Sequence, residues 1–248
     1  MHRFFIAGTN IMGNHAIMKG RDAEHVRVLR LRAGDDVILC DTEGNDYKCR
    51  LVKSTKEEVE AEIIEVKPCK SEPDVKVTVI CGLPKGSDKT DYIIQKCVEA
   101  GAYEICFFAS DRCVAKIDDD DKRDKKLERW QRISEEAAKQ SGRGIIPQVR
   151  WLGEYADALN EANQKELKLF MYETGDDREV LNNVLEAGKE ASSIAIITGP
   201  EGGFAQFEAD LAKALKFHIC TLGERILRCE TAPLVALTAA MYATGNLG

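Results

Sequence analysis

The sequence lacks any hydrophobic run long enough to cross a bilayer, which takes roughly 20 apolar residues in a helix. Its opening residues, MHRFFIAGTN, also lack the apolar core and the cleavage site of a secretory signal. We therefore expect a cytoplasmic protein that makes no contact with a membrane. Its 248 residues, 44% hydrophobic and 31% charged, suffice for one large domain or two smaller ones.

The nine cysteines include no C-x-x-C pair, so the usual ligand spacing of a structural zinc site is missing. The odd count and the lack of an export signal argue against a disulfide framework. Most of these cysteines lie in apolar stretches, where we expect buried small side chains. No G-x-x-x-x-G-K-[ST] motif is present, which excludes a P-loop. We expect no metal.

An excess of positive charge is also absent, because the net charge is −7. Nucleic-acid-binding domains are often basic, so an RNA-binding surface here has to be local. One basic stretch lies between residues 3 and 32, with six basic and two acidic residues. It is either a solvated helix face or a phosphate-binding patch. The arginines of interest in it are Arg3, Arg27, Arg30 and Arg32.

Residues 1–72 have the pattern of a small β-rich domain. Runs rich in β-branched residues over 37–40, 47–52 and 59–66 predict strands, and the last alternates with period two. Short strands at this spacing favour a barrel. A helix is predicted over 23–31, and the proline-bearing segment 67–73 is typical of a linker.

Residues 73–248 alternate apolar strands with helices, which predicts an α/β domain with a parallel sheet. We expect strands over 75–81, 104–108, 167–172, 193–197 and a short one ending at 222, and helices over 88–100, 178–187, 206–216 and 232–244. The last helix is apolar nearly all round, so it is either the central helix of a monomer or part of a dimer interface.

A long helix is predicted over 121–141, with Trp130 on its apolar face and a basic ridge opposite. Arg132 and Lys139 lie on that ridge, and Arg143 follows in the turn after the helix. The ridge is either a solubilising surface or an RNA contact.

Two loops follow the carboxyl ends of two apolar strands, where open α/β sheets bind ligands. The first is residues 199–204, GPEGGF, and the second is residues 222–232, LGERILRCETA. Gly202 and Gly203 allow a ligand to approach the backbone closely, and N–H groups near a helix start suit an acidic or heteroaromatic group. Taken alone, each loop is equally well explained as a tight turn.

Together, the two loops resemble the cofactor-binding loops of the trefoil-knotted (SPOUT) methyltransferases, and within them the ribosomal small-subunit RNA methyltransferase E family. The resemblance extends to HRFF at residues 2–5, to HVRVLRLRAGD at 25–35 and to EAAKQSGR at 136–143. It implies an N-terminal PUA-like β-barrel domain over 1–72 and a C-terminal α/β trefoil-knot methyltransferase domain over 73–248. Threaded chains are nearly absent among proteins, so the knot near 222–231 is implied by the resemblance alone.

The resemblance also implies a function, the transfer of the methyl group of S-adenosylmethionine to N3 of a uridine in 16S rRNA of the small ribosomal subunit. It further implies a homodimer that shares its active site between chains. From the charge pattern, we predict RNA contacts by the arginines above together with Arg132 and Lys139. The residues that the resemblance assigns to the cofactor are Glu173, Thr198, Gly199, Glu201, Gly202, Gly203, Leu222, Gly223, Ile226, Leu227, Arg228 and Thr231.

Uracil N3 carries a proton and is a poor nucleophile until that proton leaves, so a base or an anion-stabilising cation is needed. The candidates by position are Glu230, Arg143, Glu201 and Arg228, and we predict Arg143 and Glu230 as catalytic. The alternative function is a non-catalytic RNA-binding or ribosome assembly factor.

Overall fold

The computed structural model describes residues 1–55, 57–117, 119–174 and 178–247. Its packing divides the chain into two units. The first contains Met1–Glu72 and Ala138–Ile146, and the second contains Pro73–Ala137 and Pro147–Gly248. Residues 138–146, which the sequence analysis assigned to the second domain, therefore pack within the first unit.

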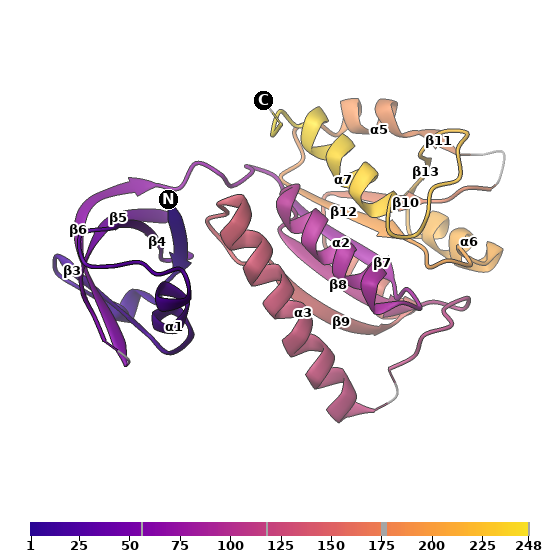
Figure 1. The fold of residues 1–248 in the computed structure, drawn as a ribbon. Coiled ribbons are helices and arrows are strands. Elements are labelled where there is room, and N and C mark those ends of the chain that lie inside the picture. Colours follow the sequence, from indigo (N-terminus) through magenta and orange to yellow (C-terminus); the bar gives the residue numbers. More distant parts are fainter. Residues whose placement is uncertain (56, 118, 175–177, 248) are drawn as a thin grey trace. The chain divides into compact units, whose positions relative to one another are not determined.

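The first unit is built on a six-stranded sheet in the order β1-β4-β5-β6-β3-β2. Its elements are β1 (His2–Phe5), the 3-10 turn η1 (Gly8–Asn10), β2 (Ile11–Met12), β3 (His15–Lys19), α1 (Gly20–Val28), β4 (Asp36–Cys40), β5 (Asn45–Ser54) and β6 (Glu58–Pro68). Alternation along β6 turns Val59, Ala61 and Ile63 into the core. Ala23 and Val26 of α1 join the same core, and the strands curve around it (Figure 1).

The second unit is a seven-stranded sheet in the order β11-β13-β10-β12-β7-β8-β9, and its neighbouring strands pair in parallel. The strands are β7 (Lys76–Gly82), β8 (Glu104–Ala109), β9 (Gln148–Glu154), β10 (Leu167–Met171), β11 (Glu179–Val180), β12 (Ser193–Thr198) and β13 (His218–Thr221). The helices are α2 (Ser87–Glu99), α3 (Asp120–Ser141), α4 (Tyr155–Ala162), α5 (Leu181–Ala187), α6 (Gln206–Ala214) and α7 (Ala232–Ala243). The predicted α/β class with a parallel sheet is confirmed.

Helix α3 is amphipathic as predicted. Trp130 and Ala137 are buried, whereas Arg129 and Arg132 on the opposite side are exposed. Ser134 is also buried, and its hydroxyl is satisfied by donating a 2.6 Å hydrogen bond to the carbonyl of Pro147. No helix in the described ranges is long and apolar enough to cross a membrane.

The core of the second unit holds the start of α6 and the loop before it. Phe204 is buried among aromatic rings, with its ring centroid 4.3 Å from that of Phe170 and 6.1 Å from that of Tyr155. Tyr155 also donates a 2.6 Å hydrogen bond to the carbonyl of Glu208 on α6. The glycine-rich loop is thus fixed to the core directly after its last glycine.

Candidate functional site

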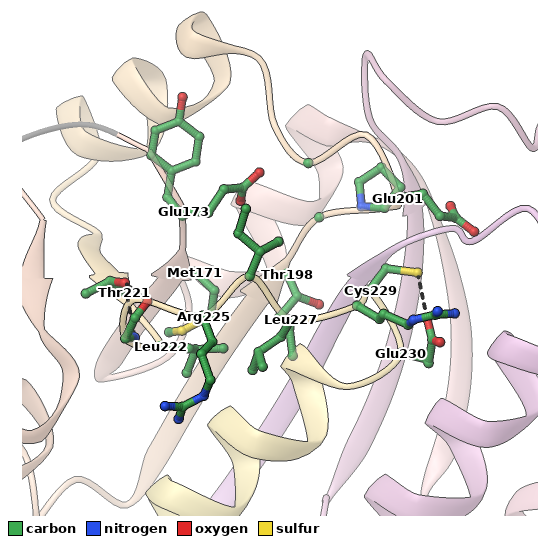
Figure 2. A pocket seen from close by; sticks show the side chains of 18 of the residues that line it. Met171, Glu173, Thr198, Glu201, Thr221, Leu222, Arg225, Leu227, Cys229 and Glu230 are labelled. Carbon is green, nitrogen blue, oxygen red and sulfur yellow. Dashed lines mark hydrogen bonds between the residues drawn. The ribbon is translucent and has the colours of Figure 1, made fainter.

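The carboxyl ends of three adjacent strands, β13, β10 and β12, surround a cavity of about 400 Å³ (Figure 2). Residues of three segments line it: 171–173 at the end of β10, 198–203 without Gly202 at the end of β12, and 221–232 without Glu224 and Thr231 at the end of β13. Lys89 of α2 completes the wall. Its size falls within the range of small-molecule sites, about 300–1,000 Å³.

The first glycine-rich loop turns sharply at Gly203, whose φ is +62° and whose N–H donates to the carbonyl of Pro200 at 2.9 Å. A Cβ at this position would collide with the Glu173 carboxylate. Gly199 is equally confined, because its Cβ would lie 3.1 Å from the backbone of Gly203. The left-handed backbone favours glycine at residue 203, and any larger residue would also have to displace the Glu173 carboxylate.

Gly202 differs from what the sequence analysis expected. It does not line the cavity and has no positive φ. Its Cα faces Arg112 instead: a Cβ there would lie 3.0 Å from the Arg112 Cβ, and Arg112 Nη1 donates to the Gly202 carbonyl at 3.0 Å. Of the two glycines, Gly203 lines the cavity and Gly202 does not, and the close approach of the Gly203 backbone to a ligand stays a prediction.

The second loop begins with a turn at Gly223, whose φ is +97° and whose N–H donates to Thr221 Oγ1 at 3.2 Å. It then presents apolar side chains to the cavity from Leu222, Ile226 and Leu227. Ile226 is 85% exposed, so most of its apolar surface is free to contact a ligand. This wall suits a flat heteroaromatic ring.

Three carboxylates also line the cavity, those of Glu173, Glu201 and Glu230 (Figure 2). Glu201 forms an ion pair with Lys89 Nζ at 2.8 Å and accepts a 3.1 Å hydrogen bond from the Lys85 N–H. Burial disfavours its charged form, but these donors outweigh burial and lower the pKa of Glu201. Glu201 is therefore an ion at neutral pH.

Glu230 accepts a 3.2 Å hydrogen bond from Cys229 Sγ. Burial, with further contributions from Glu230 and Glu201, raises the pKa of Cys229 to about 12. The Cys229 side chain is thus a neutral thiol that donates to the Glu230 carboxylate.

Most of the residues predicted for the cofactor line this cavity, and so does the predicted catalytic Glu230. Those predicted for the cofactor are Glu173, Thr198, Gly199, Glu201, Gly203, Leu222, Gly223, Ile226, Leu227 and Arg228. Thr231 does not line it; this residue is the N-cap of α7, and its N–H donates to the Arg228 carbonyl at 2.9 Å. Thr198 lines the cavity, but its hydroxyl donates to Cys81 Sγ at 3.3 Å.

Several lining residues were not predicted. Met171, Tyr172, Pro200, Thr221, Arg225, Cys229 and Ala232 adjoin predicted positions. Lys89 is different, because it lies on α2, 112 residues before its partner Glu201. Only the packing of α2 beside the glycine-rich loop brings the two together, so no local pattern in the sequence indicated Lys89.

Arg143, the other predicted catalytic residue, lies in the first unit and does not line the cavity. Its side chain is 3% exposed and forms an ion pair with Glu72, at 2.8 Å from Nε and 2.7 Å from Nη2. Burial disfavours the Glu72 carboxylate, but Arg143 outweighs burial and lowers the pKa of Glu72. The N–H groups of Gly144 and Ile145 also donate to Glu72. Here Arg143 anchors the turn after α3, and its catalytic role stays a prediction.

The predicted RNA-binding residues divide into two groups. Arg27, Arg30 and Arg32 are exposed in the first unit. Arg3 is instead 8% exposed and pairs with Asp46 at 2.9 Å, and Lys139 is 15% exposed and pairs with Asp22 at 3.1 Å. These two side chains are engaged within the unit, contrary to the idea of a freely exposed patch. Arg132 of the second unit is 53% exposed, near Glu128.

Comparison with known proteins gives matches along nearly the whole chain. An RNA methyltransferase domain model matches residues 71–241, and an RNA methyltransferase PUA domain model matches residues 19–64. The chain is 36% identical to "Ribosomal RNA small subunit methyltransferase E" of Bacillus subtilis (strain 168), over 98% of this chain and 97% of the relative. It is 34% identical to the protein of the same name from Mesomycoplasma hyopneumoniae (strain 232), over 96% and 98%.

Solved structures of similar proteins share the fold. A ribosomal RNA small subunit methyltransferase E from Neisseria gonorrhoeae, bound to S-adenosyl methionine, superposes with a TM-score of 0.87 at 32% identity, covering 98% of this chain and 97% of that one. A putative methyltransferase from Legionella pneumophila, in complex with the same cofactor, gives 0.86 at 28% identity and covers 97% of each chain. The predicted order of domains, a PUA domain followed by a methyltransferase domain, is thereby confirmed.

Proposed function

The chain belongs to the ribosomal RNA small subunit methyltransferase E family, and on that premise we propose that it transfers a methyl group from S-adenosylmethionine to small-subunit ribosomal RNA. The acceptor that we propose is N3 of a uridine in 16S rRNA. The observation that carries the proposal is the cavity where three parallel strands end, because both loops that the sequence assigned to the cofactor line it.

The residues of the cavity fit this methyl donor. Leu222, Ile226 and Leu227 offer an apolar wall to its adenine. The carboxylates of Glu173 and Glu230 suit its positively charged groups, since opposite charges attract strongly where water is excluded. Gly203 and Gly223 have left-handed backbone, which favours glycine, and because glycine has no Cβ both turns leave room for a ligand beside the backbone.

When bound, the donor supplies an electrophilic methyl carbon attached to a sulfonium. The N3 electron pair forms the new N–C bond as the S–C bond breaks, and the bonding pair stays on sulfur. The N3 proton has to leave, and Glu230 is the carboxylate that we assign to accept it. The chain's further contribution is to align the two reactants and exclude water.

RNA binding is assigned to the exposed arginines of the first unit, Arg27, Arg30 and Arg32. A chain with a net charge of −7 repels RNA in general, so a local cluster of guanidinium groups has to provide the phosphate contacts. We further propose that the chain is a homodimer, that residues 222–231 form a trefoil knot and that the domain boundary lies near residue 72.

The test is a methylation assay with small subunits from a strain that lacks the modification. We expect transfer of one labelled methyl group, and mass mapping of the digested rRNA should identify the product as N3-methyluridine. Fully modified subunits are the control, and they should accept no label. If the protein binds small subunits but neither binds S-adenosylmethionine nor transfers a methyl group, the alternative function as an assembly factor is correct.

A further inference from the structure

Lys89 is a cation at the cavity that the sequence did not reveal. It lies on the first turns of α2, its side chain is 29% exposed, and it lines the cavity together with Glu201 and Glu230. The other cationic side chains that line the cavity within the described ranges are Arg225 and Arg228. Both are exposed residues of the second loop.

The ammonium of Lys89 is fixed in place by Glu201. The two groups are 2.8 Å apart, and Glu201 is in turn held by the N–H of Lys85, which precedes α2. Because its carboxylate already accepts hydrogen bonds from both residues, Glu201 is poorly suited to take a proton from a substrate. Its role is to hold Lys89.

Lys89 remains charged at neutral pH. The hydrogen bond to Glu201 is the main influence that raises its pKa, and the charge of Glu230 acts in the same direction. A lysine with a raised pKa does not act as a base. It is a fixed positive charge in the same cavity as the carboxylate to which we assign the N3 proton.

This arrangement matches what uracil needs. When N3 loses its proton, negative charge spreads onto the two flanking carbonyl oxygens, and a cation held in place beforehand stabilises that charge without reorganisation. Arg143 does not line the cavity of its own chain, whereas Lys89 does. A charge held by an ion pair is also better organised than that of an exposed arginine on a loop.

We propose that the Lys89 ammonium is a further catalytic group, which contacts a carbonyl oxygen of the target uracil and stabilises the anion formed at N3. This proposal rests on the proposed methyl transfer to uridine N3. The bond changes are those given above: the proton leaves N3, N–C forms, and S–C breaks with its pair on sulfur. Lys89 itself gains and loses no atom.

The experiment compares Lys89→Met, Lys89→Arg and Glu201→Gln in single-turnover methylation of small subunits. The matched control is Lys96→Met, because Lys96 lies on the same helix, pairs with Glu99 at 2.9 Å and does not line the cavity. The affinity of each variant for S-adenosylmethionine is measured by calorimetry, which also shows that the variant is folded.

We expect Lys89→Met to lose roughly 10²–10³-fold in rate, as when one charge-stabilising donor is removed, with donor affinity nearly unchanged. Its rate should keep rising with pH where the wild-type rate has levelled off, because the acceptor then has to ionise without help. Lys89→Arg should recover most of the rate. Glu201→Gln should lose at least tenfold less than Lys89→Met, because the amide oxygen of glutamine can still accept a hydrogen bond from the Lys89 ammonium.

Three results would overturn the proposal: equal losses in Lys89→Met and Glu201→Gln, an unchanged pH profile in Lys89→Met, or loss of donor binding in Lys89→Met. Each would mean that Lys89 only supports the loop through Glu201. A wild-type protein that binds the donor but methylates no RNA would overturn the proposed function itself, and that result is obtained before any variant is compared.

Discussion

At the scale of single residues, Arg30 has a backbone conformation that its side chain does not explain. Its φ is +57°, in the left-handed region that normally favours glycine. It follows α1 in a turn where the Leu31 N–H donates to the Val26 carbonyl at 3.1 Å, a position that glycine usually occupies at helix ends. Strained residues are often found at functional sites, which supports the assignment of Arg30 to RNA.

Arg30→Gly should therefore stabilise the first unit while weakening RNA binding. Left-handed backbone costs a non-glycine residue about 1–2 kcal/mol, part of which the greater freedom of glycine in the unfolded chain offsets. We expect a net gain of about 1 kcal/mol, seen as a roughly fivefold slower amide hydrogen exchange in β4–β6. The salt dependence of RNA affinity should fall by about one phosphate contact.

Arg27→Ala is the control for this substitution, because Arg27 is equally exposed but lies within α1 in ordinary helical backbone. It should weaken RNA binding without stabilising the unit. A destabilised Arg30→Gly protein with unchanged RNA affinity would show that Arg30 has a structural role instead.

Glu230→Gln tests the residue that we assign as the base. The amide keeps the size of the side chain but cannot accept the N3 proton, so the single-turnover rate should fall by roughly 10²–10⁴-fold. Affinity for S-adenosylmethionine, measured by calorimetry, should change little. A normal rate in this variant would leave the cavity assignment standing but remove Glu230 from the chemistry.

At the scale of elements, hydrophobic periodicity predicted much of the fold and missed some of its strands. The buried strands β7, β8, β10 and β12 and the amphipathic α3 follow from local patterns. Strand β9 was missed because it lies at the sheet edge, where Arg150 interrupts its apolar residues and pairs with Glu104 and Glu161. Alternation is weak in such a strand.

The candidate site likewise has some features that were predicted from the sequence and others that were not. Its two loops were predicted from their resemblance, taken together, to the loops of a known family, because each loop alone is equally well explained as a tight turn. Lys89 and the burial of Arg143 were not, because both depend on contacts between distant segments. Neither pairing leaves a periodic or compositional trace in a single sequence.

The first loop offers a prediction at this scale, a contrast between its two adjacent glycines. Gly203→Ala forces a side chain into left-handed backbone and against the Glu173 carboxylate, so the turn or this carboxylate at the cavity has to shift. We expect the affinity for S-adenosylmethionine to fall about tenfold or more, equivalent to roughly 1.4 kcal/mol. Gly202→Ala has no positive φ, and its Cβ would lie 3.0 Å from the Arg112 Cβ, so Arg112 has to shift slightly outside the cavity; we expect a smaller loss of affinity than in Gly203→Ala. A stronger effect of Gly202→Ala in calorimetry would contradict this orientation of the loop.

At the scale of the whole molecule, basic and acidic residues are distributed differently, and we expect them to have different effects on RNA binding. The chain as a whole is acidic, with a net charge of −7, yet exposed arginines gather at α1 and just after it. We expect such a protein to bind RNA through a restricted surface and to be repelled elsewhere. On this proposal, the acidic remainder limits non-specific association with RNA.

Assembly of two chains is the last property that the sequence and the fold together predict. Helix α7 carries no charged residue over Ala232–Ala243. On one side of the helix, Ala236, Leu237 and Met241 are buried. Val235 is 39% exposed and Tyr242 is 77% exposed. A helix that is apolar on its solvent side is typical of one that is covered by a partner.

We therefore expect the double variant Val235→Glu/Tyr242→Glu to be a monomer. Light scattering at micromolar concentration should give about twice 27.5 kDa for the parent and about 27.5 kDa for the variant, because two charges per chain would otherwise be buried at the interface. Phe207→Glu is the control: Phe207 is 58% exposed on α6, a different helix, and the variant should stay dimeric. If the active site is shared between chains, the monomer should also lose methylation while each cavity still binds S-adenosylmethionine. A parent protein of 27.5 kDa would show that α7 is an exposed apolar face of a monomer.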